Sequence, residues 1–314
     1  MENVAILMST YNGGKYISEQ IESIINQTYK NWKLYIRDDG SSDNTIDIIK
    51  KYIKDDSRII FIEDNKSLRP ARSFFSLLSS VEATYYFFCD QDDYWLENKL
   101  EVMLNKMLGL NNSIPQVVYC NLKCTDENLV PRKYGFDNLV GKVSGKNRLI
   151  GNDMPGCIMM FNKKVRDLFV KNLPKEVEKV SMHDWWIALI GQVFGEVHFI
   201  DERLIYYRQH SNNTLGAGKS GNTLGKLFQR DLIDKQKRLV RESYFQDLVF
   251  ADAFSNQLPN DYKEILSDLR LCKKGSKIYR YHFLKKYELK QMSWIRTFAF
   301  SVVFIFLFEG STLK

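Results

Sequence analysis

The first 110 residues alternate between short apolar runs and amphipathic segments, and this alternation constrains the fold more than any other feature. The apolar runs predict strands, and the segments between them, with apolar residues three or four positions apart, predict helices. The predicted strands are residues 4–8, 33–37, 58–62 and 85–89, and helices are expected over 16–25, 46–53, 70–78 and 96–108. Beyond this region, a last strand is predicted over 204–208. Repeated strand–helix units predict an α/β fold with a mostly parallel, Rossmann-like sheet and helices on both faces.

Polar residues follow three of these four strands, at 9–14, 38–43 and 90–93. In parallel sheets, ligands bind at the carboxyl ends of the strands, so we expect these clusters to converge on one crevice. One polar cluster after a strand is readily explained as a turn. Three clusters, two of them with adjacent carboxylates, favour a binding site.

The cluster at 90–93 contains three carboxylates, from Asp90, Asp92 and Asp93. Carboxylates this close repel one another unless a cation or hydrogen-bond donors compensate them. Oxygen ligands suit Mg²⁺ or Mn²⁺, especially when a substrate phosphate completes the coordination. A helix cap near Trp95 would explain Asp93 but not the other two residues.

Several other chemistries are poor fits. The chain has no Gly-x-Gly-x-x-Gly after its first strand, no Walker A motif and no serine nucleophile elbow. Its five cysteines are odd in number and widely spread, and the N-terminus lacks a signal-peptide pattern, which favours free thiols in a reducing cytoplasm. Cys120 and Cys124 have a zinc-like spacing, but no second pair follows nearby, so we expect core thiols.

The ordered motifs resemble those of family 2 glycosyltransferases, which have the GT-A fold. They are Ser9-Thr10-Tyr11-Asn12, Arg37-Asp38-Asp39-Gly40-Ser41-Ser42-Asp43 and Asp90-Gln91-Asp92-Asp93. Four further segments, at 69–74, 87–95, 183–186 and 207–213, resemble the bacterial rhamnosyltransferase subgroup, and the resemblance covers about residues 3–215. The family commonly has glycine where this chain has Arg69, which puts the conformation of that loop in question.

The resemblance implies an inverting, metal-dependent transfer of a sugar from a nucleotide-activated donor. It implies that Asp184 is the catalytic base, that Asp92 and His210 bind Mg²⁺ or Mn²⁺, that Thr10, Tyr11, Asp39, Arg72 and Asp90 bind the donor, and that Asp153, Trp185 and Trp186 bind the acceptor. Four of these residues also have a structural explanation: a helix cap for Asp184, a turn for Asp153 and core packing for Trp185 and Trp186.

The resemblance favours L-rhamnose from dTDP-β-L-rhamnose as the donor sugar and a polyprenyl-linked glycan as the acceptor, in the synthesis of a surface polysaccharide. A transferase that uses a UDP-sugar, galactosyl or glucosyl, is the nearest alternative. Two other classes are a phosphatase with an aspartyl nucleophile and a non-catalytic carbohydrate-binding protein. The phosphatase fits less well, because its Asp-x-Asp motif usually follows the first strand.

The net charge of +7 is unevenly distributed. Residues 1–218 carry 27 basic and 28 acidic side chains, whereas residues 219–314 carry 18 and 10. Within 270–296 there are nine basic residues and one acidic residue, and the apolar segment 294–308 follows directly. This segment is shorter than the roughly 20 residues of a spanning helix.

From the resemblance and this charge distribution together, we expect a GT-A domain over 1–218 and a helical C-terminal extension over 219–314. We expect the extension to attach the protein peripherally to an anionic membrane, on the cytoplasmic face of the bacterial cell membrane, and we expect no nucleic-acid partner. The alternative is that 294–308 forms a buried closing helix.

Overall fold

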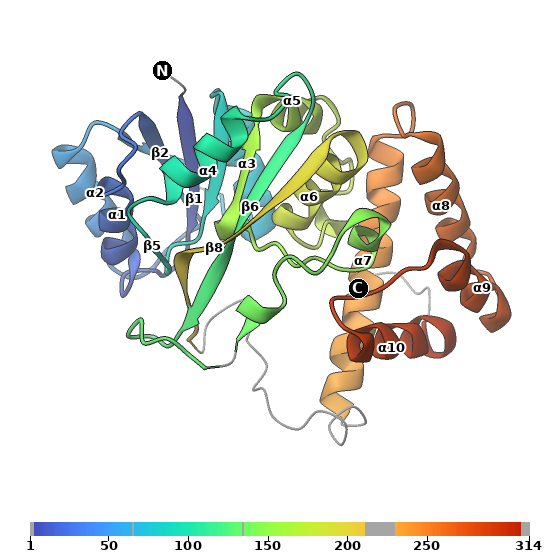
Figure 1. Ribbon diagram of the computed structural model, residues 1–314. Coiled ribbons are helices and arrows are strands. Elements are labelled where there is room, and N and C mark those ends of the chain that lie inside the picture. Colours follow the sequence, from blue (N-terminus) through green and yellow to red (C-terminus); the bar gives the residue numbers. More distant parts are fainter. Residues whose placement is uncertain (1–2, 65, 134, 211–229, 309–314) are drawn as a thin grey trace.

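The computed structural model describes residues 3–64, 66–133, 135–210 and 230–308, and Figure 1 shows its central sheet with the C-terminal helices at one end. Eight strands form the sheet in the order β3-β2-β1-β4-β7-β6-β8-β5. The strands are β1 (Val4–Thr10), β2 (Trp32–Asp38), β3 (Ile59–Ile62), β4 (Tyr85–Cys89), β5 (Tyr94–Trp95), β6 (Gln116–Thr125), β7 (Met159–Asn162) and β8 (Glu196–Arg208). Strands β1 to β4 are mutually parallel and β6 is parallel to β8, whereas β7 and β5 pair antiparallel with their neighbours.

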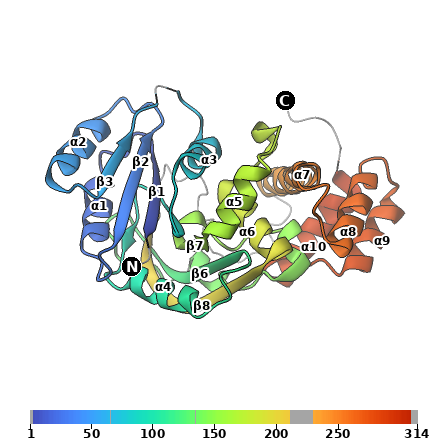
Figure 2. The same ribbon diagram turned by 90° about the horizontal axis from the view of Figure 1, so that it is seen from above.

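Helices cover both faces of the sheet, as predicted (Figure 2). They are α1 (Ile17–Ile25), α2 (Thr45–Asp55), α3 (Pro70–Ser80), α4 (Lys99–Leu108), α5 (Lys163–Lys171), α6 (His183–Phe194), α7 (Arg230–Ala253), α8 (Asn260–Leu271), α9 (Lys277–Tyr287) and α10 (Trp294–Val302). Helices α3, α5 and α6 pack against one another on one face, and α1, α2 and α4 lie on the other.

The predicted elements of the first 110 residues are present, with ends that differ by a few residues. The later strands differ more. Strand β8 begins at Glu196, whereas the sequence predicts a strand only from residue 204. The first half of β8 contains several charged residues, so it lacks an apolar run, although it pairs with β6. Strand β5 was not predicted, since it is two residues long and exists through its pairing with β8.

Helix α6 is buried around nearly its whole circumference, because it lies between the sheet and α7. Trp186 on α6 packs edge-on against Phe250 of α7, with ring centroids 5.2 Å apart. The apolar core is therefore continuous from the sheet into the C-terminal helices. All five cysteines lie in this core as free thiols, as expected.

The apolar segment near the C-terminus divides into α10 and a π-helical turn, Val303–Leu307. One side of this segment is buried, where Phe300 and Phe304 stack and Phe308 packs against Tyr244 of α7. Its other side remains exposed. Among the described residues, no helix combines the length and the apolar character that crossing a membrane requires.

Candidate active site

The loops after β1, β2 and β4 meet at one edge of the sheet, as the sequence predicted. Gln91 joins the first and third loops, because its side chain accepts from the Tyr11 N–H at 2.9 Å and donates to the Tyr11 carbonyl at 3.0 Å. The Asn12 N–H donates to Ser41 at 2.8 Å and so joins the first loop to the second. A side chain at Gly13 would collide with Gln91, since a Cβ there would lie 2.2 Å from its Oε1.

Asp92 and His210 are in direct contact, with 2.7 Å between Oδ2 and Nε2. His210 follows β8, and its ring stacks on Tyr16 with centroids 5.0 Å apart. Arg208 at the end of β8 is buried, and its Nε donates to the Asp92 carbonyl at 2.7 Å. Strand β8 is thereby fixed to the acidic loop, and the two metal ligands expected from the sequence lie side by side.

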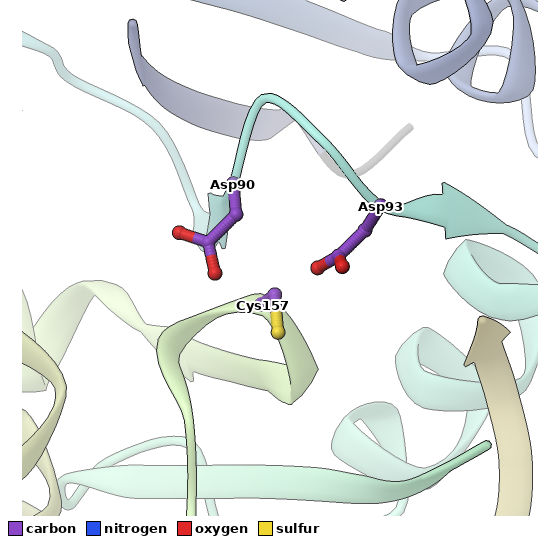
Figure 3. Close-up of side chains that lie close together, drawn as sticks. All are labelled: Asp90, Asp93 and Cys157. Carbon is purple, nitrogen blue, oxygen red and sulfur yellow. The ribbon is translucent and has the colours of Figure 1, made fainter. Parts of the chain in front are cut away.

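Asp90 and Asp93, at the two ends of this loop, lie close to Cys157 of a neighbouring turn, and the ligand atoms of the three residues are within 4.8 Å of one another (Figure 3). One oxygen of the buried Asp93 accepts from the Arg208 N–H at 3.0 Å, and the other has no partner among the described residues. Burial, together with the charges of Asp92 and Asp90, raises the pKa of Asp93 well above its usual value.

The carboxylates of the 90–93 loop therefore repel one another more than the surrounding hydrogen-bond donors compensate. Burial, and the charges of Asp92 and Asp184, raise the pKa of Asp90 to about 7. A divalent cation would relieve this repulsion, so the site fits Mg²⁺ or Mn²⁺. Oxygen and imidazole ligands suit these ions better than a thiol does, and burial raises the pKa of Cys157, which keeps it protonated. Asp92 and His210 are the better ligand pair.

Asp184 lies in the first turn of α6 and is almost fully buried. Its carboxylate accepts hydrogen bonds from Asn152 Nδ2 at 3.2 Å, from the Gly156 N–H at 3.1 Å and from the Trp185 N–H. Burial outweighs these bonds and raises the pKa of Asp184 to about 7. A carboxyl group with this pKa can exchange a proton near neutral pH, as a general base must.

The preceding residue, His183, is buried against Phe74, with ring centroids 3.9 Å apart. Neither of its ring nitrogens has a partner among the described residues. Burial lowers the pKa of His183 to about 3, so it is neutral and adds no positive charge beside Asp184.

Two of the residues expected to bind the donor are engaged in the protein's own structure. Thr10 is fully buried and donates to Asp38 at 2.9 Å. The Asp39 carboxylate accepts from Arg37 at 2.7 Å and from the N–H groups of Leu68 and Arg69 at 2.6 and 2.8 Å. Burial favours a higher pKa for Asp39, but these bonds outweigh it and lower the pKa. In this arrangement the two residues shape the loops, whereas Tyr11 is exposed at the sheet edge.

The residues expected on the acceptor side are also engaged. Asp153 is fully buried and accepts from Arg148 at 3.0 Å and from the Val143 N–H at 2.8 Å. Trp185 Nε1 donates to the Arg148 carbonyl at 2.6 Å, and Trp186 is buried in the core. None of these three side chains presents a free polar group at the surface, and acceptor binding by them stays a prediction.

Arg72, the remaining residue expected to bind the donor, lies on α3 with a half-exposed side chain 3.5 Å from Glu178. No hydrogen bond joins it to the acidic loop among the described contacts. Conversely, Gln91, Asn152 and Arg208 hold the site together but were not predicted. Gln91 and Arg208 lie within motifs noted in the sequence, but the partners of the three residues are 80, 32 and 116 residues away in the chain, so local patterns could not show these contacts.

The chain has the GT-A fold, since it matches glycosyltransferases of known structure along most of its length. Staphylococcus aureus TarS in complex with UDP matches over 96% of this chain and 90% of that one, with a TM-score of 0.53 at 15% identity. The mannosyltransferase PcManGT of Pyrobaculum calidifontis, in complex with GDP-Man and Mn²⁺, matches over 96% and 84%, with a TM-score of 0.52 at 15% identity.

The chain belongs to glycosyl transferase family 2, whose sequence profile matches residues 5–169. The dTDP-rhamnosyl transferase RfbG of Shigella flexneri is 30% identical over 226 residues, which are 68% of this chain and 75% of the relative. The UDP-Glc:alpha-D-GlcNAc-diphosphoundecaprenol beta-1,3-glucosyltransferase WfgD of Escherichia coli is 32% identical over 155 residues, which are 49% and 58%. The protein is therefore a glycosyltransferase.

Proposed function

We propose that the protein transfers a sugar, with inversion, from a nucleotide-activated donor to a hydroxyl group of a lipid-linked glycan. The observation that carries the proposal is that two polar centres lie at the same acidic loop. One is the Asp92–His210 contact, and the other is the buried Asp184, whose charge helps to raise the pKa of Asp90 in this loop. One centre suits a cation beside a diphosphate and the other suits a proton acceptor, and a metal-dependent inverting transfer uses both.

In this proposal Asp184 accepts the proton of the acceptor hydroxyl as that oxygen attacks the anomeric carbon. Its three hydrogen-bond donors fix the orientation of the carboxylate. Asp90 contacts the ribose or sugar of the donor, and the exposed Tyr11 ring is available to the nucleobase. Thr10 and Asp39 hold the loops that receive the base, in place of contacting it directly.

Asp92 and His210 would hold Mg²⁺ or Mn²⁺, which when bound stabilises the negative charge of the departing nucleoside diphosphate. Support comes from the uncompensated carboxylates of the acidic loop and from the Mn²⁺ in the complex of PcManGT. Arg72 lies outside the described contacts of this loop, so we assign it no role in the reaction.

For the donor we propose dTDP-β-L-rhamnose, because the relative RfbG is a dTDP-rhamnosyl transferase. A UDP-sugar is the alternative, supported by the UDP-Glc named for WfgD and the UDP bound to TarS. The diphosphoundecaprenol in the name of WfgD supports a polyprenyl-linked acceptor. With such an acceptor, we propose that the enzyme acts at the cytoplasmic face of the bacterial cell membrane, in the synthesis of a surface polysaccharide.

A donor panel tests this function. The melting temperature of the protein would be measured with Mn²⁺ and dTDP-rhamnose, UDP-glucose or UDP-galactose, followed by assays of transfer to a lipid-linked acceptor. We expect stabilisation and transfer with dTDP-rhamnose. A response to a UDP-sugar but not to dTDP-rhamnose would show that the donor is a UDP-sugar. Phosphate release without any sugar nucleotide would indicate a phosphatase. Transfer by Asp184→Asn at the wild-type rate would exclude Asp184 as the base.

A further inference from the structure

Exposed apolar side chains gather on the C-terminal helices. Seven of the eleven large hydrophobic residues that are exposed in the described chain lie within 271–307. On α10 and the following turn, Trp294, Phe298 and Phe306 are 71%, 58% and 56% exposed, and on α9 Ile278 is 70% exposed. Isolated exposed hydrophobic residues are common on soluble proteins, but a cluster of aromatic residues on one short segment marks an interaction surface.

The same helices carry uncompensated positive charge. Among the described residues, seven cations of this region have no carboxylate within ion-pair distance: Lys273, Lys274, Lys277, Arg280, Lys285, Lys290 and Arg296. The charges adjoin the apolar side chains, because the Lys277 ammonium lies 5.6 Å from the centroid of the Phe306 ring. Aromatic side chains flanked by lysine and arginine suit the headgroup region of an anionic bilayer, which attracts the cations and accommodates the rings.

This surface is joined to the loop that holds the candidate base. Gln291, at the start of the turn into α10, donates to the Ile150 carbonyl, and the Lys290 N–H donates to Asn147 at 2.7 Å. Two residues after Ile150, Asn152 donates to Asp184. Helices α8 to α10 lie at the end of the molecule opposite α2 (Figure 1). The loop of residues 147–152, which contacts the candidate base Asp184, is thus also bonded to the segment that leads into the apolar and basic surface.

We propose that α9, α10 and the turn after it form a membrane-docking face, defined by Ile278, Trp294, Phe298 and Phe306 with their neighbouring cations, that binds an anionic lipid bilayer. The inference rests on the proposed function for its purpose, since docking would present a lipid-linked acceptor to Asp184. The binding itself requires neither donor nor metal. The bonds of Gln291 and Lys290 then set the position of the acceptor loop relative to the bilayer surface.

Tryptophan fluorescence offers a direct readout. The other four tryptophans, Trp32, Trp95, Trp185 and Trp186, are buried, so a shift of emission on adding vesicles reports on Trp294. We expect a shift to shorter wavelength with vesicles of phosphatidylglycerol and phosphatidylcholine. With phosphatidylcholine alone, or at high salt, we expect little shift, since screening weakens the attraction.

Vesicle co-sedimentation would compare two sets of substitutions with a control. The first set is the double variant Phe298→Ser with Phe306→Ser, and the second is the triple variant Lys273→Gln, Lys274→Gln and Lys277→Gln. We expect each set to weaken vesicle binding about tenfold or more. The control is Leu108→Ser with Val130→Ser, two exposed residues outside the docking face, which leaves binding unchanged. All these side chains are on the surface, so circular dichroism should show folded proteins.

Equal vesicle binding by the wild type and both sets of substitutions would overturn the proposal. So would a stable dimer in sedimentation that Phe298→Ser dissociates, because a second copy would then cover the face. Donor-induced stabilisation without vesicles tests the proposed function separately, and the docking-face substitutions should leave it unchanged.

Discussion

Nε2 of His210 lies 2.7 Å from Oδ2 of Asp92, although 118 residues separate them in the chain. Removing either of these two proposed metal ligands should weaken metal activation. For His210→Ala we expect the concentration of Mn²⁺ that gives half-maximal transfer to rise about 10- to 100-fold. For Asp92→Asn we expect a loss of comparable or larger size. Glu127→Gln is the control, because Glu127 is a nearby exposed carboxylate paired with Lys15. Unchanged Mn²⁺ activation in His210→Ala would contradict the assignment.

Transfer should depend on pH through Asp184. A base must be deprotonated, and the pKa of Asp184 is raised to about 7 by burial. We expect the rate at saturating metal and donor to fall about tenfold for each pH unit below 7 and to level off above it. Asp184→Asn should retain donor binding while losing transfer by at least about 100-fold. A residual activity of Asp184→Asn that keeps the wild-type pH profile would show that another group is the base.

The same carboxylate should reduce stability at high pH. The pKa of Asp184 is higher in the folded state than its usual value of 3.8, so between pH 4 and 7 the folded state holds the extra proton. The free energy of unfolding therefore falls as pH rises through this window and stays low above it. We expect Asp184→Asn to be more stable than the wild type at pH 8 by about 1–2 kcal/mol, and no more stable at pH 4, by urea unfolding. If the free energies of unfolding of the wild type and Asp184→Asn changed with pH in parallel, this prediction would be wrong.

Arg69 adopts a backbone conformation that favours glycine, with φ 68° and ψ 160°. Glycine, which the family resemblance led us to expect at this position, adopts such a conformation without strain. The backbone strain at Arg69 costs on the order of 1–3 kcal/mol. The Asp39 carboxylate accepts a hydrogen bond from the Arg69 N–H and so helps to stabilise this conformation. We expect Arg69→Gly to stabilise the fold by about 1 kcal/mol, after the greater entropy of unfolded glycine is subtracted, in thermal or urea unfolding. Arg69→Ala keeps the strain, so an equal gain from alanine would point to the lost side chain.

Gln246 on α7 should be a positioning residue for Asp184. Its buried Oε1 accepts from the N–H groups of Ser181 and Met182, at 3.1 and 3.4 Å, just before α6 begins. We expect Gln246→Leu to lower kcat about tenfold while leaving donor affinity unchanged, and to destabilise the fold by about 1–2 kcal/mol. Ser243→Ala is the matched control, because it removes a buried hydroxyl of α7 that bonds only to Val240 among the described contacts. Equal kcat values for the two variants would reduce Gln246 to a structural role.

The sequence predicted the parts of this molecule that depend on local pattern. The first four strands and their helices follow from hydrophobic periodicity, and the convergence of their loops follows from a parallel sheet. The adjacency of Asp92 and His210 agrees with what the family resemblance implied. Sequence reasoning was weaker wherever burial decides the role of a residue. Asp153 is a polar residue in a glycine-rich loop, and only the packing of Arg148 around it reveals a buried ion pair.

The bonds that α7 and the turn before α10 make to the segments around Asp184 have a consequence for evolution and for engineering. Gln246 and Gln291 both come from outside the 5–169 segment that defines the family. Turnover can therefore diverge between relatives through substitutions in helices that carry none of the shared motifs. We expect a chimera that exchanges only those helices to inherit the motifs of one parent and the positioning of Asp184, the proposed base, from the other.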